Sequence, residues 1–126
     1  MTATARSQLR VARDPSLGLV VRIFVGAVVE RWNVSVGTRD DLRLAASELF
    51  SAAVEAGDGE DVSFTLTLDD RGVAFEAHGL DAAGEDGSLD PAVRNGRLDL
   101  VRALFPSVSV DGSVRIDVPV GDGPAR

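Results

Sequence analysis

The sequence predicts an α+β fold, a two-layer α/β sandwich in which one mixed or antiparallel sheet carries its helices on one face. Residues 62–68 alternate between apolar side chains and Ser or Thr, which is the period-two pattern of a half-buried strand. Residues 42–53 instead repeat their apolar side chains at three- and four-residue steps, which places them on one side of a helix. Because the Ser and Thr face of the strand is too hydrophilic to be covered, helices are expected on the other face only.

The composition is typical of a single folded domain, expected over residues 9–120 between a disordered N-terminus (1–8) and a disordered tail (121–126). The chain contains no cysteine, which excludes disulfides and thiolate metal sites and suits a reducing compartment. Its formal net charge of -7 would repel phosphate backbones, so no nucleic-acid partner is expected. No long apolar run and no signal-peptide pattern occurs, so we expect no membrane contact and a cytoplasmic location.

The first predicted helix covers residues 15–32 and follows a short strand predicted at 9–12. Asp14 followed by Pro15 is typical of a helix start, because Asp caps free N–H groups and Pro fits the first turn. This helix is apolar nearly all round, a pattern typical of a helix that is deeply packed or covered by a partner. Trp32 at its end is expected in the core, with an interface position as the alternative.

The apolar residues of this helix exceed what one packed face can use. The stripe expected to face the core consists of Leu17, Val21, Phe24 and Val28. Leu19, Ile23 and Val29 are the surplus, and we expect these three to form an interface with a protein partner or a second copy. The alternative is that the helix is simply buried between the sheet and the next helix.

The second predicted helix covers residues 41–57. Thr38 and Asp41 resemble a capping box with Asp in place of Glu. Gly57 supplies the stop, because glycine enters the left-handed C-terminal conformation without penalty. Glu48 lies beside the apolar stripe at the edge of the buried face, so its carboxylate faces either solvent or a pocket.

The second half of the chain is expected to add two hairpins and a short helix. Strands at 62–68 and 73–77 flank an Asp-Asp-Arg-Gly turn. The short helix is expected at 98–105. A second hairpin is expected from 108–110 and 114–120, because an Asp-Gly pair between them is a strong tight-turn signal.

Several polar residues raise the question of ligands. Residues 79–95 lack periodicity, and a connection of that length is typical of a functional or mobile loop. His78 is the lone histidine and is expected to point outward from a strand rather than to bind a metal. Gly96 and Arg97 precede a helix and would suit an anion, but Asp99 in its first turn weakens such a site. The acidic loop residues lack calcium-loop spacing and are expected to be solvated: Asp81, Glu85, Asp86 and Asp90.

Three segments carry a resemblance: Glu48-Leu-Phe-Ser-Ala52-Ala-Val-Glu-Ala56, Ala77-His-Gly79 and Asn95-Gly-Arg-Leu98. In this element order they fall where the GHKL (Bergerat-fold) ATPases carry their helix, strand and glycine motifs. From about residue 9 to residue 120 the chain resembles that family, and its closest branch looks like the small bacterial anti-sigma-factor serine kinases. The resemblance implies the histidine-kinase-like ATPase fold.

The resemblance also implies roles for individual positions. Glu48 matches the family glutamate that orients the attacking group, whereas the magnesium-binding asparagine falls on Ala52 and the adenine-reading aspartate on Ala77. Alanine offers no oxygen to magnesium, and a missing acceptor for the adenine amino group costs about 1–3 kcal/mol. We therefore expect a vestigial nucleotide pocket without cofactor or metal, formed by Glu48, Ala52, Ala77, Gly79, Gly96 and Leu98.

These expectations define the function. By resemblance, the chain is expected to be a non-catalytic pseudokinase of bacterial transcription regulation, which binds a sigma factor or a STAS-type anti-anti-sigma partner and forms a possible homodimer. The alternative is an active anti-sigma-factor serine kinase that uses ATP and magnesium with unusual ligands, and Glu48 would then be catalytic. A third interpretation is a detached sensor-kinase ATPase-like domain that dimerises without enzymatic activity.

Overall fold

The structure, a computed structural model, describes residues 5–57, 59, 61–80, 94–110 and 113–120. Within them the chain forms an α+β domain of five strands and three α-helices. In chain order these are β1 (Ala5–Val11), α1 (Gly18–Arg31), α2 (Val36–Glu55), β2 (Val62–Asp69), β3 (Gly72–His78), α4 (Asp99–Leu104), β4 (Ser109–Val110) and β5 (Val114–Val118). A 3-10 turn at Pro15–Leu17 precedes α1, and a π-helical turn at Arg94–Leu98 leads into α4.

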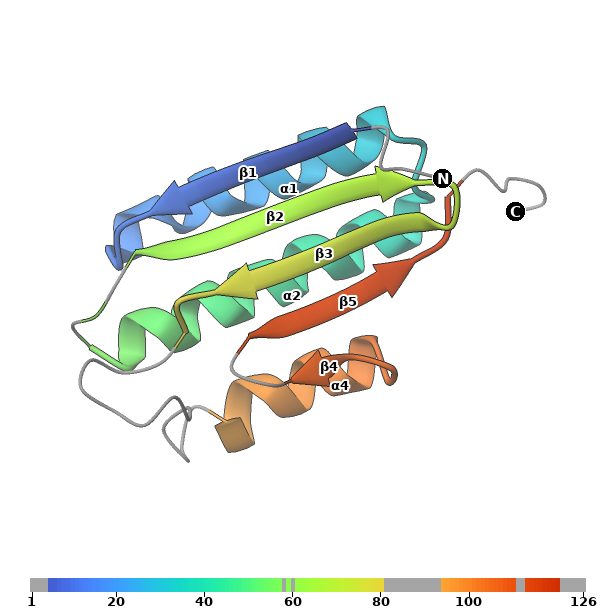
Figure 1. Ribbon diagram of the computed structural model, residues 1–126. Coiled ribbons are helices and arrows are strands. Elements are labelled where there is room, and N and C mark those ends of the chain that lie inside the picture. The colour runs from blue at the N-terminus through green and yellow to red at the C-terminus, as the bar shows by residue number, and fades with distance from the viewer. Residues whose placement is uncertain (1–4, 58, 60, 81–93, 111–112, 121–126) are drawn as a thin grey trace.

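The five strands form one antiparallel sheet in the order β1-β2-β3-β5-β4. Figure 1 shows α1, α2 and α4 together behind one face of this sheet. Leu66, Phe75 and Ile116 pair in register across β2, β3 and β5, and all three are buried toward the helices. The period-two patterns therefore predicted the α+β class and the one-sided helical layer correctly.

The core lies between the sheet and the helices. From the sheet, Phe64 and Phe75 meet with ring centroids 6.0 Å apart and planes tilted by 31°, a packed aromatic arrangement. From the helices, the buried side chains include Val21, Val25, Val29, Leu42, Leu49 and Leu98. The opposite face of β2 carries Ser63, Thr65 and Thr67, as the alternation predicted, although Thr65 in the centre of the sheet is only 3% exposed.

The N-terminal strand is longer than its pattern suggested. Residues 5–8 belong to β1, so the expectation of a disordered 1–8 segment is wrong for them, and residues 1–4 lie outside the described part. The reason is tertiary, because β1 pairs residue by residue with β2 from Ala5 to Val11. Asp14 caps the following turn as predicted, since its side chain accepts from the Ser16 N–H at 2.9 Å.

Helix α2 begins earlier than the sequence indicated. Its N-cap is Ser35, whose hydroxyl accepts from the Thr38 N–H at 3.4 Å, and the helix starts at Val36. The predicted capping box at Thr38 and Asp41 is therefore wrong, since both residues lie inside the helix. Its end agrees with the prediction, because Gly57 follows the helix with a φ of 93°, in the left-handed region.

The first hairpin turns where the sequence placed it. The Asp69 carboxylate accepts from the backbone N–H groups of Arg71 and Gly72 at 2.8 and 3.2 Å. Gly72 has a φ of 138°, and a Cβ there would lie 2.2 Å from the Val118 carbonyl oxygen, so a side chain has no room.

The C-terminal elements also follow the predicted order. Helix α4 ends at Leu104, shortly before Pro106, and β4 pairs with β5. The loop predicted at 79–95 is shorter at its C-terminal end, because residues 94 and 95 already belong to the π-helical turn, and residues 81–93 lie outside the described part. The predicted Asp-Gly turn and the expected disordered tail fall on residues 111–112 and 121–126, which are also not described.

Candidate functional site

Glu48 on α2 forms an ion pair with Arg97 of the turn that leads into α4. Arg97 Nη1 donates to Glu48 Oε1 at 2.6 Å, and Arg97 Nε and Nη2 donate to Glu55 Oε1 and Oε2 at 3.2 and 2.5 Å. Two turns of α2 separate the two glutamates, so both carboxylates project from the same side of the helix. We call these three residues the Arg97 cluster.

The Arg97 cluster shifts the pKa values of two of its members, Glu55 and Arg97. The hydrogen bond from Arg97, assisted by its charge and opposed by slight burial, lowers the pKa of Glu55 below the ordinary value. The pKa of Arg97 is raised, chiefly by the hydrogen bond to Glu55 and next by that to Glu48. The Glu48 carboxylate is occupied by Arg97 through Oε1, so that oxygen is not free to orient an attacking group.

The other residues of the expected nucleotide pocket do not supply ligands. Ala52 and Ala77 are buried on α2 and β3, and Leu98 belongs to the hydrophobic core. Methyl groups offer no oxygen to magnesium and no acceptor to adenine. These positions therefore do not fit the nucleotide and metal that the resemblance implies for its family. Gly96 is exposed in the turn before α4, and a Cβ built there would meet no other described residue within 4 Å.

Gly79 has a different role, as a partner of Arg13. Arg13 Nη2 donates to the Gly79 carbonyl at 2.7 Å, while Nη1 donates to the carbonyls of Ala53 and Gly57 at 3.1 Å each. The guanidinium thus lies at the C-terminal end of α2, where a cation is favourable to the helix dipole. Gly79 itself has a φ of 79°, and a Cβ there would lie 2.4 Å from the Asp61 carbonyl oxygen. This glycine serves the backbone path after β3.

The outer side of α1 and α2 carries a second candidate site. Of the six exposed large apolar side chains among the described residues, five lie on these two helices: Leu19, Val20, Ile23, Val36 and Leu44. A groove of about 350 Å³ runs between the helices, and Ile23 and Val36 contribute apolar side chains to it. We call this feature the α1/α2 groove.

The structure corrects one member of the predicted interface. Leu19 and Ile23 are 56% and 59% exposed, in line with the expected surface, but Val29 is fully buried. Val29 follows Val21 and Val25 at four-residue steps, which turns it toward the core. Trp32 packs against the core as expected.

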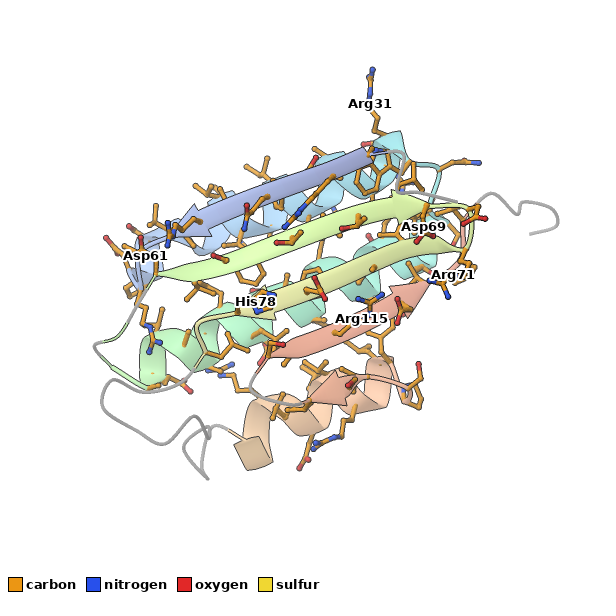
Figure 2. The ribbon with its side chains drawn as sticks, in the orientation of Figure 1. Arg31, Asp61, Asp69, Arg71, His78 and Arg115 are labelled. Atoms are coloured by element: carbon orange, nitrogen blue, oxygen red, sulfur yellow. The ribbon has the colours of Figure 1, made fainter. Side chains whose placement is uncertain are left out.

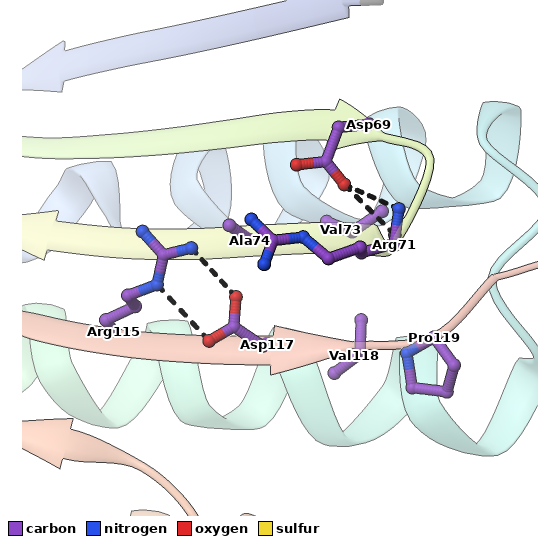
Figure 3. Close-up of a pocket in the computed structure, with 9 residues that line it drawn as sticks. Asp69, Arg71, Val73, Ala74, Arg115, Asp117, Val118 and Pro119 are labelled. Atoms are coloured by element: carbon purple, nitrogen blue, oxygen red, sulfur yellow. Dashed lines mark hydrogen bonds and ion pairs between the residues drawn. The ribbon is translucent and has the colours of Figure 1, made fainter. Parts of the chain in front are cut away.

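A shallow pocket of about 410 Å³ lies on the open face of the sheet, near the first hairpin turn (Figure 3). Arg71 extends there across Ala74, and the small side chain of Ala74 leaves room for the pocket. Arg115 in its wall is held by Asp117 and by Glu76 at 3.0 Å. Figure 2 shows the same face with the labelled side chains of His78 and Arg115.

No metal site emerges from the described side chains. Among these residues, no group of three or more His, Cys, Asp or Glu is placed to hold an ion. His78 is exposed at the end of β3, as its position in the strand pattern predicted. Within the same part of the chain, no helix is both long and apolar enough to cross a membrane.

Two arginines of these sites have no signal in the sequence patterns. The sequence pattern around Gly96 and Arg97 suggested an anion site rather than an ion pair with α2, and no pattern singled out Arg13. Their partners lie 40–66 residues away along the chain, a separation at which periodicity carries no information. The length and charge of an arginine near a helix end were the available hints.

Comparisons with known proteins give no family for these sites: no protein-family model and no curated protein matches the chain. The function is therefore inferred from the residues, their geometry and the resemblance of the three motif segments.

Proposed function

We propose that this chain is a non-catalytic regulatory module that resembles the anti-sigma-factor kinases and acts by binding a protein, either a sigma factor or a STAS-type partner. The element order supports the proposal: one strand, two helices, a hairpin, a helical segment and a second hairpin, with the helices on one sheet face. The finer assignment to the histidine-kinase-like ATPase fold rests on the resemblance of the three motif segments.

The observation that carries the proposal is the Arg97 cluster. Under the resemblance, Glu48 is the one catalytic position with a matching side chain, and Arg97 holds its carboxylate at 2.6 Å. The arginine comes from the segment that the resemblance aligns with the phosphate-binding glycine motif. In this chain that segment binds the glutamate side chain instead. Phosphoryl transfer depends on a positioned metal, and here Ala52, at the position that the resemblance aligns with the magnesium ligand, supplies no oxygen for one.

A nucleotide titration tests the non-catalytic part of the proposal. We expect no thermal stabilisation by ATP with magnesium at millimolar concentration. A ligand at a hundred times its dissociation constant stabilises a fold by about 2.7 kcal/mol, so micromolar binding would be visible. The variant Arg97→Gln tests whether the alanines or the arginine prevent ATP binding. ATP should remain without effect on this variant, because Ala52 and Ala77 still supply no ligand.

A clear melting shift of the natural chain with ATP would instead favour the active serine kinase. A shift seen only in Arg97→Gln would show that the arginine, rather than the alanines, closes the pocket.

Calorimetric titration with sigma factors and STAS-domain proteins tests the binding part. We expect saturable binding to one of them, with the same affinity in the presence and absence of ATP and magnesium. Phosphate transfer to the STAS partner, followed by mass spectrometry, would contradict the proposal. Dimers without affinity for either class would favour the detached sensor-kinase domain.

A further inference from the structure

The α1/α2 groove combines an exposed apolar strip with a row of arginines. Arg22, Arg39 and Arg43 line it against two acids, Glu30 and Asp40, so its lining has a net charge of +1 in a chain of formal charge -7. Contacts between the two helices show how the arginines are arranged. Arg22 reaches Ser47 at 3.5 Å, and Arg39 approaches Glu30 at 3.5 Å further along the antiparallel helix pair.

The position of Arg43, in the middle of the groove, depends on a glycine of α1. A Cβ at Gly26 would lie 2.8 Å from Arg43 Cδ, so the absence of a side chain on α1 lets the Arg43 stem lie across that helix. The Arg43 guanidinium remains near the groove and pairs with Asp40 on its own helix. From residue 22 to residue 30 the row spans about 12 Å of helix, which is a little over two turns.

Arg39 is the member whose bonding is incomplete. Its Nε is buried and, among the described residues, is the one buried side-chain polar atom without a hydrogen-bond partner. Its ion pair with Glu30 is loose, since the Glu30 side chain is 71% exposed. A buried N–H of a guanidinium without an acceptor is costly, so Arg39 is incompletely satisfied within the chain. Its side chain is 23% exposed, and a carboxylate of a partner would bind the guanidinium from that exposed side.

We propose that the α1/α2 groove docks an acidic amphipathic helix of a partner protein, whose apolar stripe covers Leu19 and Ile23 and whose carboxylate binds Arg39. A helix is the fitting occupant because two antiparallel helices offer a straight groove for a third, in the usual helix-in-groove mode. Acidic residues one or two turns apart on that helix match the spacing of the arginine row.

A second copy of the chain fits this groove less well. A two-fold contact brings the same patch together from both copies, so a lining of net charge +1 would face a second lining of net charge +1. Like charges brought together in this way oppose association. An acidic helix is instead attracted to the groove at short distances, where salt does not screen the charges. The inference rests on the proposed function, because it gives the chemistry of the protein partner named there.

Fluorescence anisotropy with two synthetic peptides tests the inference. Both are helical, about 18 residues or five turns long, with the same Leu stripe; one carries Glu beside the stripe and the other carries Lys at the same places. We expect the full chain to bind the acidic peptide saturably and at least about tenfold more tightly than the basic one. Ile23→Ser and Arg39→Gln should each weaken that binding about tenfold.

Leu100→Ser and Arg102→Gln are the matched controls, since both residues are exposed on α4 and outside the groove, and they should leave the affinity unchanged. Circular dichroism confirms that each variant is folded. The inference is overturned if the acidic peptide shows no saturable binding up to about 1 mM, if both peptides bind equally, or if Arg39→Gln binds like the natural chain. Sedimentation that shows a dimer abolished by Ile23→Ser would assign the groove to a second copy and overturn it as well.

The outcome is separable from that of the nucleotide titration. A chain that binds ATP with magnesium and also the acidic peptide retains this inference and loses the proposed function. A chain that binds neither ligand retains the non-catalytic assignment and loses this inference.

Discussion

Arg97 contacts two carboxylates on α2 from a turn more than 40 residues further along the chain, and it is the residue on which the interpretation of Glu48 depends. The single side chain satisfies Glu48 and Glu55 together and anchors the turn before α4 to α2. The chemistry available to Glu48 is thus set by its neighbour, because the arginine occupies one oxygen of the carboxylate with a charged hydrogen bond.

Arg97→Gln should destabilise the domain by about 1 kcal/mol at neutral pH, the upper range for a partly exposed ion pair. The pKa of Glu55 is lowered in the folded state, so its contribution is present above the ordinary value of 4.5 and is lost as the pH falls through the lower folded value. The difference between variant and natural chain should therefore shrink in urea unfolding as the pH falls below 4.5. The control is Arg102→Gln on α4, and a cost for Arg97→Gln that does not change with pH would contradict the assignment.

At the scale of an element, helix α1 shows that the buried side of a helix that is apolar all round can be identified only from the tertiary structure. One side, with Val21, Val25 and Val29, is fully buried against the core. The other side exposes Leu19 and Ile23 beside the α1/α2 groove. The two sides have similar hydrophobicity, and burial by the sheet and α2 alone distinguishes them.

A pair of substitutions separates the two sides. Val29→Ala should lower the free energy of unfolding by about 2 kcal/mol, because it removes two buried methyl groups and leaves a small cavity. Ile23→Ala should change it by less than about 0.5 kcal/mol, as expected for an exposed position. Denaturant unfolding of both variants checks this, and Ile23→Asp should also remain folded. Equal costs at the two positions would show that α1 is buried on both sides.

At the scale of the whole molecule, Arg13 connects three segments. It joins the segment after β1 to the C-terminal end of α2 and to Gly79, which follows β3. Its three carbonyl partners are 40, 44 and 66 residues away in the sequence. These bonds connect segments that no strand pairing unites, so they contribute to the stability of the complete fold rather than to one element.

Arg13→Met should therefore destabilise the whole domain by about 2 kcal/mol, since three carbonyls lose a charged donor. Arg10→Met, at an exposed position of β1, is the control and should stay within about 0.5 kcal/mol. Thermal unfolding followed in the far ultraviolet measures both. A single transition at lower temperature is expected for Arg13→Met, and a melting temperature equal to that of the control would refute the role of Arg13.

The sequence by itself determined the element types, the antiparallel hairpins and the side of the sheet that carries helices. These follow from local geometry, because the alternation at 62–68 and the helical period at 42–53 can be satisfied in one way each. The tertiary structure decided that Arg97 meets Glu48, that Arg13 meets Gly79, and that Val29 is buried. Those outcomes depend on how α1 rotates against its neighbours and on contacts between segments more than 40 residues apart, about which periodicity contains no information.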